Sequence, residues 1–154
     1  MTNDKISEIE QKYMNKMQLK VNCIDTNVII AEIARAGGKT DGVMAPRIVR
    51  VADAMPGEMS FLVHKTYVSL MTNIVPNIRA VFSQITASGR PLLEEGVHYV
   101  IGAKKLPPHF HKPRRPITYP KHSIVFVTGH HLKLVSSDMP ESSAGDSAVH
   151  AFIE

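Results

Sequence analysis

Several residue types that often define a function are scarce in this chain. It has no tryptophan, a single cysteine and only 6% aromatic residues among its 154. The lone cysteine, Cys23, excludes an internal disulfide and fits a reducing compartment. The apolar runs are far shorter than the ~20 residues that a membrane-spanning helix needs, and the polar start Met1–Lys5 predicts no secretory signal. We therefore expect a cytoplasmic protein, or a virion protein if the source is viral, with no membrane partner.

Acidic residues are missing from one long stretch, although the formal net charge is only +4. No Asp or Glu stands between Gly96 and Ser137, whereas the tail that follows is acidic and has no Lys or Arg. The basic residues of the acid-free stretch are Lys104, Lys105, Lys112, Arg114, Arg115, Lys121 and Lys133. A basic patch before an acidic tail indicates polyanion binding or head-to-tail contacts between copies. A plain solvated surface is the alternative.

No catalytic or cofactor-binding arrangement stands out in the sequence. The adjacent Glu94 and Glu95 would point in different directions, and a Gly-x-Ser-x-Gly elbow is absent. The run Gly37–Thr40 resembles the end of a phosphate-binding P-loop, but position 33 is Ile where that motif has Gly, and the preceding segment reads as helix. We interpret the run as a helix end followed by a flexible loop. We thus expect no enzyme activity, no cofactor and no small-molecule substrate.

The dominant pattern that is present lies between Met59 and Ala87. Two interleaved sets of positions recur every seven residues: Phe61, Val68, Val75 and Phe82, and His64, Met71, Ile78 and Ile85. Apolar residues at alternating spacings of three and four form one face of a helix. The pattern predicts one long buried helix over about 59–87, kinked by Pro76.

Shorter patterns predict the other elements. Before the long helix we expect helices over about 3–17 and 26–36, a loop over 39–46, and short strands over 19–24 and 47–51. Beyond Gly89 the period changes to two, and we expect strands over 97–101, 123–127, 132–135 and 149–153, with a tight turn at 128–131. The prediction is a single α+β domain, 1–154. Its helical part is 1–89, and its small antiparallel β part is 90–154.

An arm rich in proline, arginine and histidine separates the first two of these strands. Residues 106–122 contain five of the ten prolines, so the arm should be extended, with its backbone partners outside itself. The candidate interface or polyanion-binding residues in and around it are Lys104, Lys105, Lys112, Arg114, Arg115 and Lys121. Phe110 and Tyr119 are candidates for stacking on bases. His109 and His111 are weak candidates for metal ligands, because the surrounding positive charges disfavour a cation.

These patterns lead to three functional hypotheses. The first is a structural subunit of a large assembly, such as a capsid, neck or tail component of a virion, whose arm clasps neighbouring subunits. Its partners would be further copies of the chain or other structural proteins. The alternative is a small basic nucleic-acid-binding protein. The third and most distant is a histidine-metal enzyme.

Overall fold

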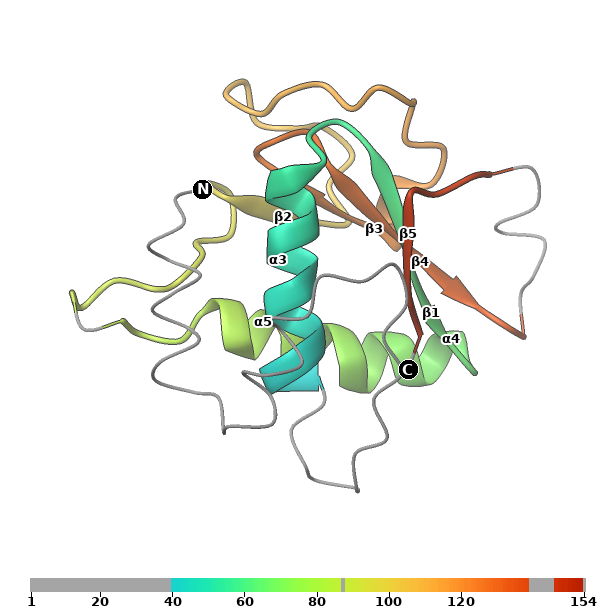
Figure 1. Ribbon diagram of the computed structural model, residues 1–154, viewed down its shortest axis with the longest axis horizontal. Helices are drawn as coiled ribbons and strands as arrows, with labels where there is room; N and C mark the ends of the chain where they lie inside the picture. The colour runs from blue at the N-terminus through green and yellow to red at the C-terminus, as the bar shows by residue number, and fades with distance from the viewer. Residues whose placement is uncertain (1–39, 87, 139–145, 154) are drawn as a thin grey trace.

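The computed structural model describes residues 40–86, 88–138 and 146–153 (Figure 1). A five-stranded sheet forms its centre, with the strands in the order β2-β3-β4-β1-β5. Helices cover one face of the sheet, and the Pro-rich arm covers part of the other. The helices and strands predicted before residue 40 lie outside the described residues.

The sheet is mixed rather than antiparallel. Strand β1 (Met59–His64) pairs in parallel with both β4 (His131–Ser136) and β5 (His150–Ile153). Strand β3 (Ser123–Phe126) pairs antiparallel with β4 and with β2 (Tyr99–Ile101). The four strands predicted in the C-terminal part are confirmed, but β1 comes from the part predicted to be helical. The division into a helical part and a β part is therefore wrong.

The long helix predicted over 59–87 is also wrong. Its first residues form strand β1, and its last residues lie beyond the end of helix α5 at Phe82. Thr66 starts the helical segment between them, because its side chain accepts a hydrogen bond from the backbone N–H of Ser69 (3.3 Å). The apolar spacing over 59–87 fits a strand as well as a helix. In the sequence, only the capping residue Thr66 marks the break between strand β1 and the helical segment. A prediction from apolar spacing alone therefore merged two elements into one helix.

The helical segment itself accommodates its proline. It runs through α4 (Tyr67–Ser69), the π-helical turn η2 (Leu70–Ile74) and α5 (Val75–Phe82). Pro76 lies in the first turn of α5, directly after the wide turn, in which the N–H of Val75 bonds to the carbonyl of Leu70. Because proline has no N–H, a change of hydrogen-bond pattern at this point is expected. The chain stays helical through the proline.

A second helical segment covers the sheet beside α5. It comprises the π-helical turn η1 (Thr40–Met44) and α3 (Ala45–Ala54), so the predicted loop over 39–46 and strand over 47–51 are wrong. Ile48, Val49 and Ala52 of α3 are buried in the same core as Leu62 of β1. Among the described residues, no helix has the length and apolar character to cross a membrane.

The arm folds back onto its own sheet. Phe110 packs with Val100 and Val125 in a small second core on the face away from the helices. Leu106 and Ile117 of the arm pack against this cluster. The arm's backbone is held by other segments of the chain: the N–H of His111 bonds to the carbonyl of Val127 (3.0 Å), and that of Arg114 to Gly57 (2.9 Å). The prediction of outside backbone partners is confirmed, and these partners belong to the same chain.

Gly129 is the tightest point between the arm and the β3–β4 turn. Its φ is +80°, and a Cβ there would lie 2.9 Å from the backbone oxygen of His111. We expect Gly129→Ala to lower the free energy of unfolding by about 2–3 kcal/mol, since both the backbone strain and the clash destabilise the native state. Gly89→Ala is the matched control, because Gly89 has φ +75° but a Cβ there would have no atom within 4 Å. Equal losses in urea titrations of the two variants would show that the arm does not constrain the turn.

Candidate functional site

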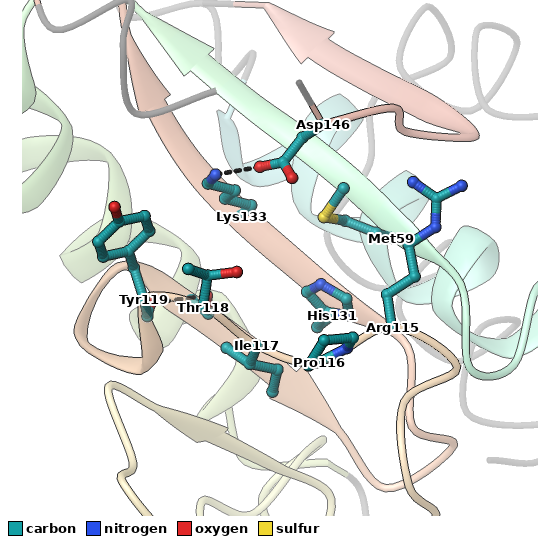
Figure 2. Close-up of a pocket in the computed structure, with 10 residues that line it drawn as sticks. Met59, Arg115, Pro116, Ile117, Thr118, Tyr119, His131, Lys133 and Asp146 are labelled. Atoms are coloured by element: carbon teal, nitrogen blue, oxygen red, sulfur yellow. Dashed lines mark hydrogen bonds and ion pairs between the residues drawn. The ribbon is translucent and has the colours of Figure 1, made fainter. Parts of the chain in front are cut away.

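A small cavity lies between the arm and the sheet (Figure 2). Its volume is about 30 Å³. The arm, strands β1, β3 and β4, and the segment before β5 all contribute to its wall. The lining residues are Met59, Arg115, Pro116, Ile117, Thr118, Tyr119, Ser123, His131, Lys133 and Asp146.

Strand register determines which side chains enter this cavity. In β4, His131 and Lys133 point to the arm side, while Leu132 and Leu134 point to the helical core. His131 pairs with Met59 of β1, and Lys133 pairs with Ser123 of β3. Because β4 is a central strand and the arm covers it, both polar residues are buried.

The buried ammonium group of Lys133 is paired with an acidic side chain of the same chain. Its ammonium group forms an ion pair with the carboxylate of Asp146, as Figure 2 shows, and lies 5.5 Å from the centre of the Tyr119 ring. Buried charges in proteins are normally paired in this way. In the sequence, Lys133 differs from the other basic residues of the acid-free stretch only by its place between Leu132 and Leu134 in a predicted strand. That place is the signal that could have indicated its burial.

Two adjacent histidines, His130 and His131, are also buried, and His131 lines the same cavity as this ion pair. Burial is the largest cause that lowers the pKa of His131 to about 4, and neighbouring His130 lowers it further, while Asp146 opposes the shift. Burial also lowers the pKa of His130, whose Nδ1 lies 2.8 Å from the carbonyl oxygen of Met55. His131 Nδ1 has no hydrogen-bond partner in the described structure. Both rings are therefore neutral at pH 7.

The size of the cavity limits its chemistry. Pockets for metabolites and cofactors usually measure ~300–1,000 Å³, whereas this cavity has room for about one or two water molecules. Its hydroxyl groups are partly engaged, since the Ser123 hydroxyl donates to the Tyr119 carbonyl (3.1 Å). The cavity therefore suits a water molecule or a small ion.

The predicted basic residues, in the arm and at the two positions just before it, are exposed. Lys104, Lys105, Lys112 and Lys121 are exposed, and none of the four forms an ion pair with a described residue. The two arginines are exposed but engaged within the chain. Arg114 forms an ion pair with Glu58, and Arg115 donates to the carbonyl (2.8 Å) and hydroxyl (3.0 Å) of Ser147.

The two aromatic residues predicted to stack have different environments. Tyr119 is 53% exposed, whereas Phe110 is 7% exposed and belongs to the small core beneath the arm. Phe110 cannot contact a base while the arm is in place. The Pro-Pro-x-Phe spacing gave no sign that this aromatic ring would face inward.

The histidines of the arm and hairpin do not converge on a metal site. His109 Nε2 lies 3.0 Å from the carbonyl oxygen of Val97, and His122 stacks on Tyr67 with ring centres 4.7 Å apart. His111 is exposed. No group of three or more potential metal ligands occurs among residues 40–86, 88–138 and 146–153.

The fold gives the run Gly37–Thr40 a second interpretation. Residues 37–39 lie outside the described residues, and Thr40 is the first described residue of a helical segment that continues to Ala54. A short turn joins that segment to β1, so its first described residues lie toward the end of the sheet where β1 and β5 finish (Figure 1). Ligands of open α/β sheets bind at the carboxyl ends of parallel strands, and phosphates bind at helix N-termini.

Comparison of the chain with protein-family models, with curated proteins and with solved structures gave no match.

Proposed function

We propose that this chain is a subunit of a nucleoprotein assembly, such as a virion, and that it contacts nucleic acid through the outer side of its arm. The observation that carries the proposal is the set of four exposed lysines that form no ion pair with a described residue. Phosphate groups are the natural counter-charges for such a surface.

The attachment of the arm supports this proposal. Backbone hydrogen bonds to Val127 and Gly57 and the burial of Phe110 fix the arm before any partner arrives. A preformed surface loses less conformational entropy on binding than a free arm does. With Phe110 buried, phosphate contacts rather than base stacking would supply most of the affinity.

The assembly part of the proposal has a separate support. Strand β5 is at the edge of the described sheet, and Ile153 on it is 80% exposed. An exposed strand edge with apolar side chains is a template for pairing with another chain. Arg114 and Arg115 are engaged within their own chain, so they cannot clasp a neighbour without first leaving Glu58 and Ser147.

The arm surface is tested by removing its exposed lysine charges. The test variant has Gln in place of Lys104, Lys105, Lys112 and Lys121. We expect this variant to elute from a DNA or RNA column at much lower salt than the wild type. The slope of log K against log[salt] should fall by about 1 for each phosphate that the variant no longer binds. The control changes Lys65 and Arg90, which are exposed outside the arm, to Gln. Loss of retention in the control but not in the arm variant would contradict the proposal. Light scattering on both variants shows whether assembly depends on the same charges.

A second candidate function is binding of a nucleoside polyphosphate at the start of the segment Thr40–Ala54. It is favoured by one observation: Thr40, the last residue of the Gly-Gly-Lys-Thr run, is the first described residue of a helical segment whose described start lies toward the carboxyl ends of β1 and β5. In such a site Lys39 would bind phosphate oxygens and Thr40 would bind a hydrated Mg²⁺. Position 33 remains Ile where the motif has Gly, so the loop would have to approach the phosphates without that residue.

This second candidate predicts a specific effect of Lys39. We expect the wild type to bind a fluorescent nucleoside triphosphate with Mg²⁺, and Lys39→Ala to weaken that binding at least ~10-fold, because the variant cannot make a charged hydrogen bond to phosphate. Lys65→Ala is the control for general loss of positive charge. Fluorescence anisotropy measures both. Absence of binding by the wild type, or equal binding by Lys39→Ala, would eliminate the candidate.

A further inference from the structure

A group of three rings lies where the arm enters strand β3. The rings of His122 and Tyr67 stack with their centres 4.7 Å apart and their planes at 25°, and the centre of the Tyr119 ring lies 6.3 Å from that of His122. The 3₁₀ turn η3 (Pro120–His122) sets the spacing, because the N–H of His122 bonds to the carbonyl of Tyr119 (3.0 Å). Tyr67 belongs to helix α4, so segments distant in the sequence build this group.

Tyr119 is the most exposed of the three rings. It is 53% exposed, whereas His122 and Tyr67 are half-buried. Its backbone carbonyl also accepts a hydrogen bond from the Ser123 hydroxyl (3.1 Å), and the ammonium group of Lys133 lies 5.5 Å from its ring centre (Figure 2). The ring therefore projects from a backbone that is already fixed. Such a ring loses little conformational entropy when a flat partner stacks on it.

Exposed lysines lie beside this ring. Lys121 is part of turn η3, and a Cβ on Gly102 would lie 3.8 Å from the Cα of Lys121. Lys104 and Lys105 follow Gly102 by two and three residues, which span at most about 7 and 11 Å. All three lysines are exposed, and none of them forms an ion pair with a described residue.

Two acidic residues also lie near the three rings, and both are engaged. The carboxylate of Asp138 accepts a hydrogen bond from the N–H of Tyr67 (3.2 Å), and Asp146 is paired with Lys133. The lysines before and within the arm therefore supply the positive charge beside Tyr119.

An exposed aromatic ring beside lysines is typical of proteins that bind single strands, where bases stack on the ring and the cations contact the backbone. In a duplex the base faces are covered by neighbouring base pairs. We propose that Tyr119 stacks on an unpaired base of a single-stranded nucleic acid. The three lysines bind phosphates of the same strand. This inference rests on the proposed function and deepens it, because phosphate contacts supply most of the affinity and Tyr119 supplies the preference for unpaired bases.

Tyr119→Ala tests the stacking. The probes are fluorescein-labelled oligothymidine, oligouridine and a DNA duplex of the same length, measured by fluorescence anisotropy at one salt concentration. We expect Tyr119→Ala to bind the single strands about 5- to 10-fold more weakly than the wild type and the duplex equally well. Tyr119→Phe keeps an aromatic ring and should bind as the wild type does. The two single strands distinguish DNA from RNA, and the loss is expected for whichever of them binds.

Tyrosine fluorescence gives a second readout, because the chain has four tyrosines and no tryptophan. A base stacked on Tyr119 should quench part of this emission, after correction for absorption by the oligonucleotide. Tyr119→Phe should still bind the single strand but lose the quenched part. A purely structural role of the ring would not produce this combination.

The outcomes separate this inference from the proposed function. Equal weakening of single-strand and duplex binding in Tyr119→Ala, or quenching that persists in Tyr119→Phe, would overturn the stacking. If Tyr119→Ala binds every probe as the wild type does, the stacking is overturned and the lysine surface stands. If the wild type binds none of the probes, both are overturned.

Discussion

Replacing Phe82 with alanine is expected to lower the free energy of unfolding by about 3–5 kcal/mol, as for other fully buried aromatic residues. Phe82 has 0% of its surface exposed and ends helix α5 over the sheet. Its ring packs edge-on against Tyr99 (centres 5.0 Å apart) and Phe126 (6.1 Å). Alanine would leave a cavity where three rings meet. A guanidinium titration monitored by far-UV circular dichroism measures the loss.

Val68 is the matched control, because the seven-residue spacing placed it on the same face as Phe82. In the structure Val68 lies in the short helix α4 and is 70% exposed. Val68→Ala should change the free energy of unfolding by less than about 0.5 kcal/mol. Similar losses in the two variants would mean that the single long helix is correct and the strand–helix break is not.

Acidification from pH 7 to pH 5 is expected to cost about 2 kcal/mol of stability through His131 alone. The pKa of His131 is lowered to about 4 in the folded chain from an ordinary value of 6.5. Between these values the unfolded state binds the proton and the folded state does not, so stability falls as the pH falls. The full contribution, about 3 kcal/mol, is lost below pH 4. The lowered pKa of His130 and His150 acts in the same direction.

Urea titrations at several pH values test this expectation. His131→Gln removes the titrating group while keeping a polar side chain, and it should flatten the dependence between pH 7 and pH 5. His111→Ala, at an exposed position on the arm, should leave the dependence as in the wild type. An unchanged pH dependence in His131→Gln would show that other groups are responsible.

The C-terminal strands could be predicted because local signals agreed there. The segments around Val125 and Leu134 are rich in β-branched and apolar residues, and Gly129 has the positive φ that their tight turn requires. Before residue 89 the sequence signals for strand and for helix conflicted. Phe61 and Val63 fit both a strand and a helix face, and the parallel partner of β1 lies far along the chain in β4. Spacing in a single segment carries no information about such a partner.

The candidate site was only partly predictable for a similar reason. The exposure of Lys104, Lys105 and their neighbours follows from charge and proline content, which are local properties. The burial of Phe110 and Lys133 depends on the arm folding over β4, which brings together segments that are separate in the sequence. Pairing between Lys133 and Asp146 also crosses from the basic stretch into the acidic tail. Charge counting placed Lys133 in a basic stretch and Asp146 in an acidic tail, and it predicted contact between the two regions only from one copy to the next.

The pairing of β1 with β4 has a consequence for the order in which the molecule folds. The antiparallel hairpin of β3 and β4 needs only a short turn to close, whereas β1 must wait until β4 exists before it gains its parallel neighbour. Contacts between residues distant in sequence slow folding, because the chain between them must be ordered first. During synthesis, β1 leaves the ribosome long before His131 does. Its apolar residues then remain unpaired for the interval, so Met59–His64 needs protection from aggregation in the nascent chain.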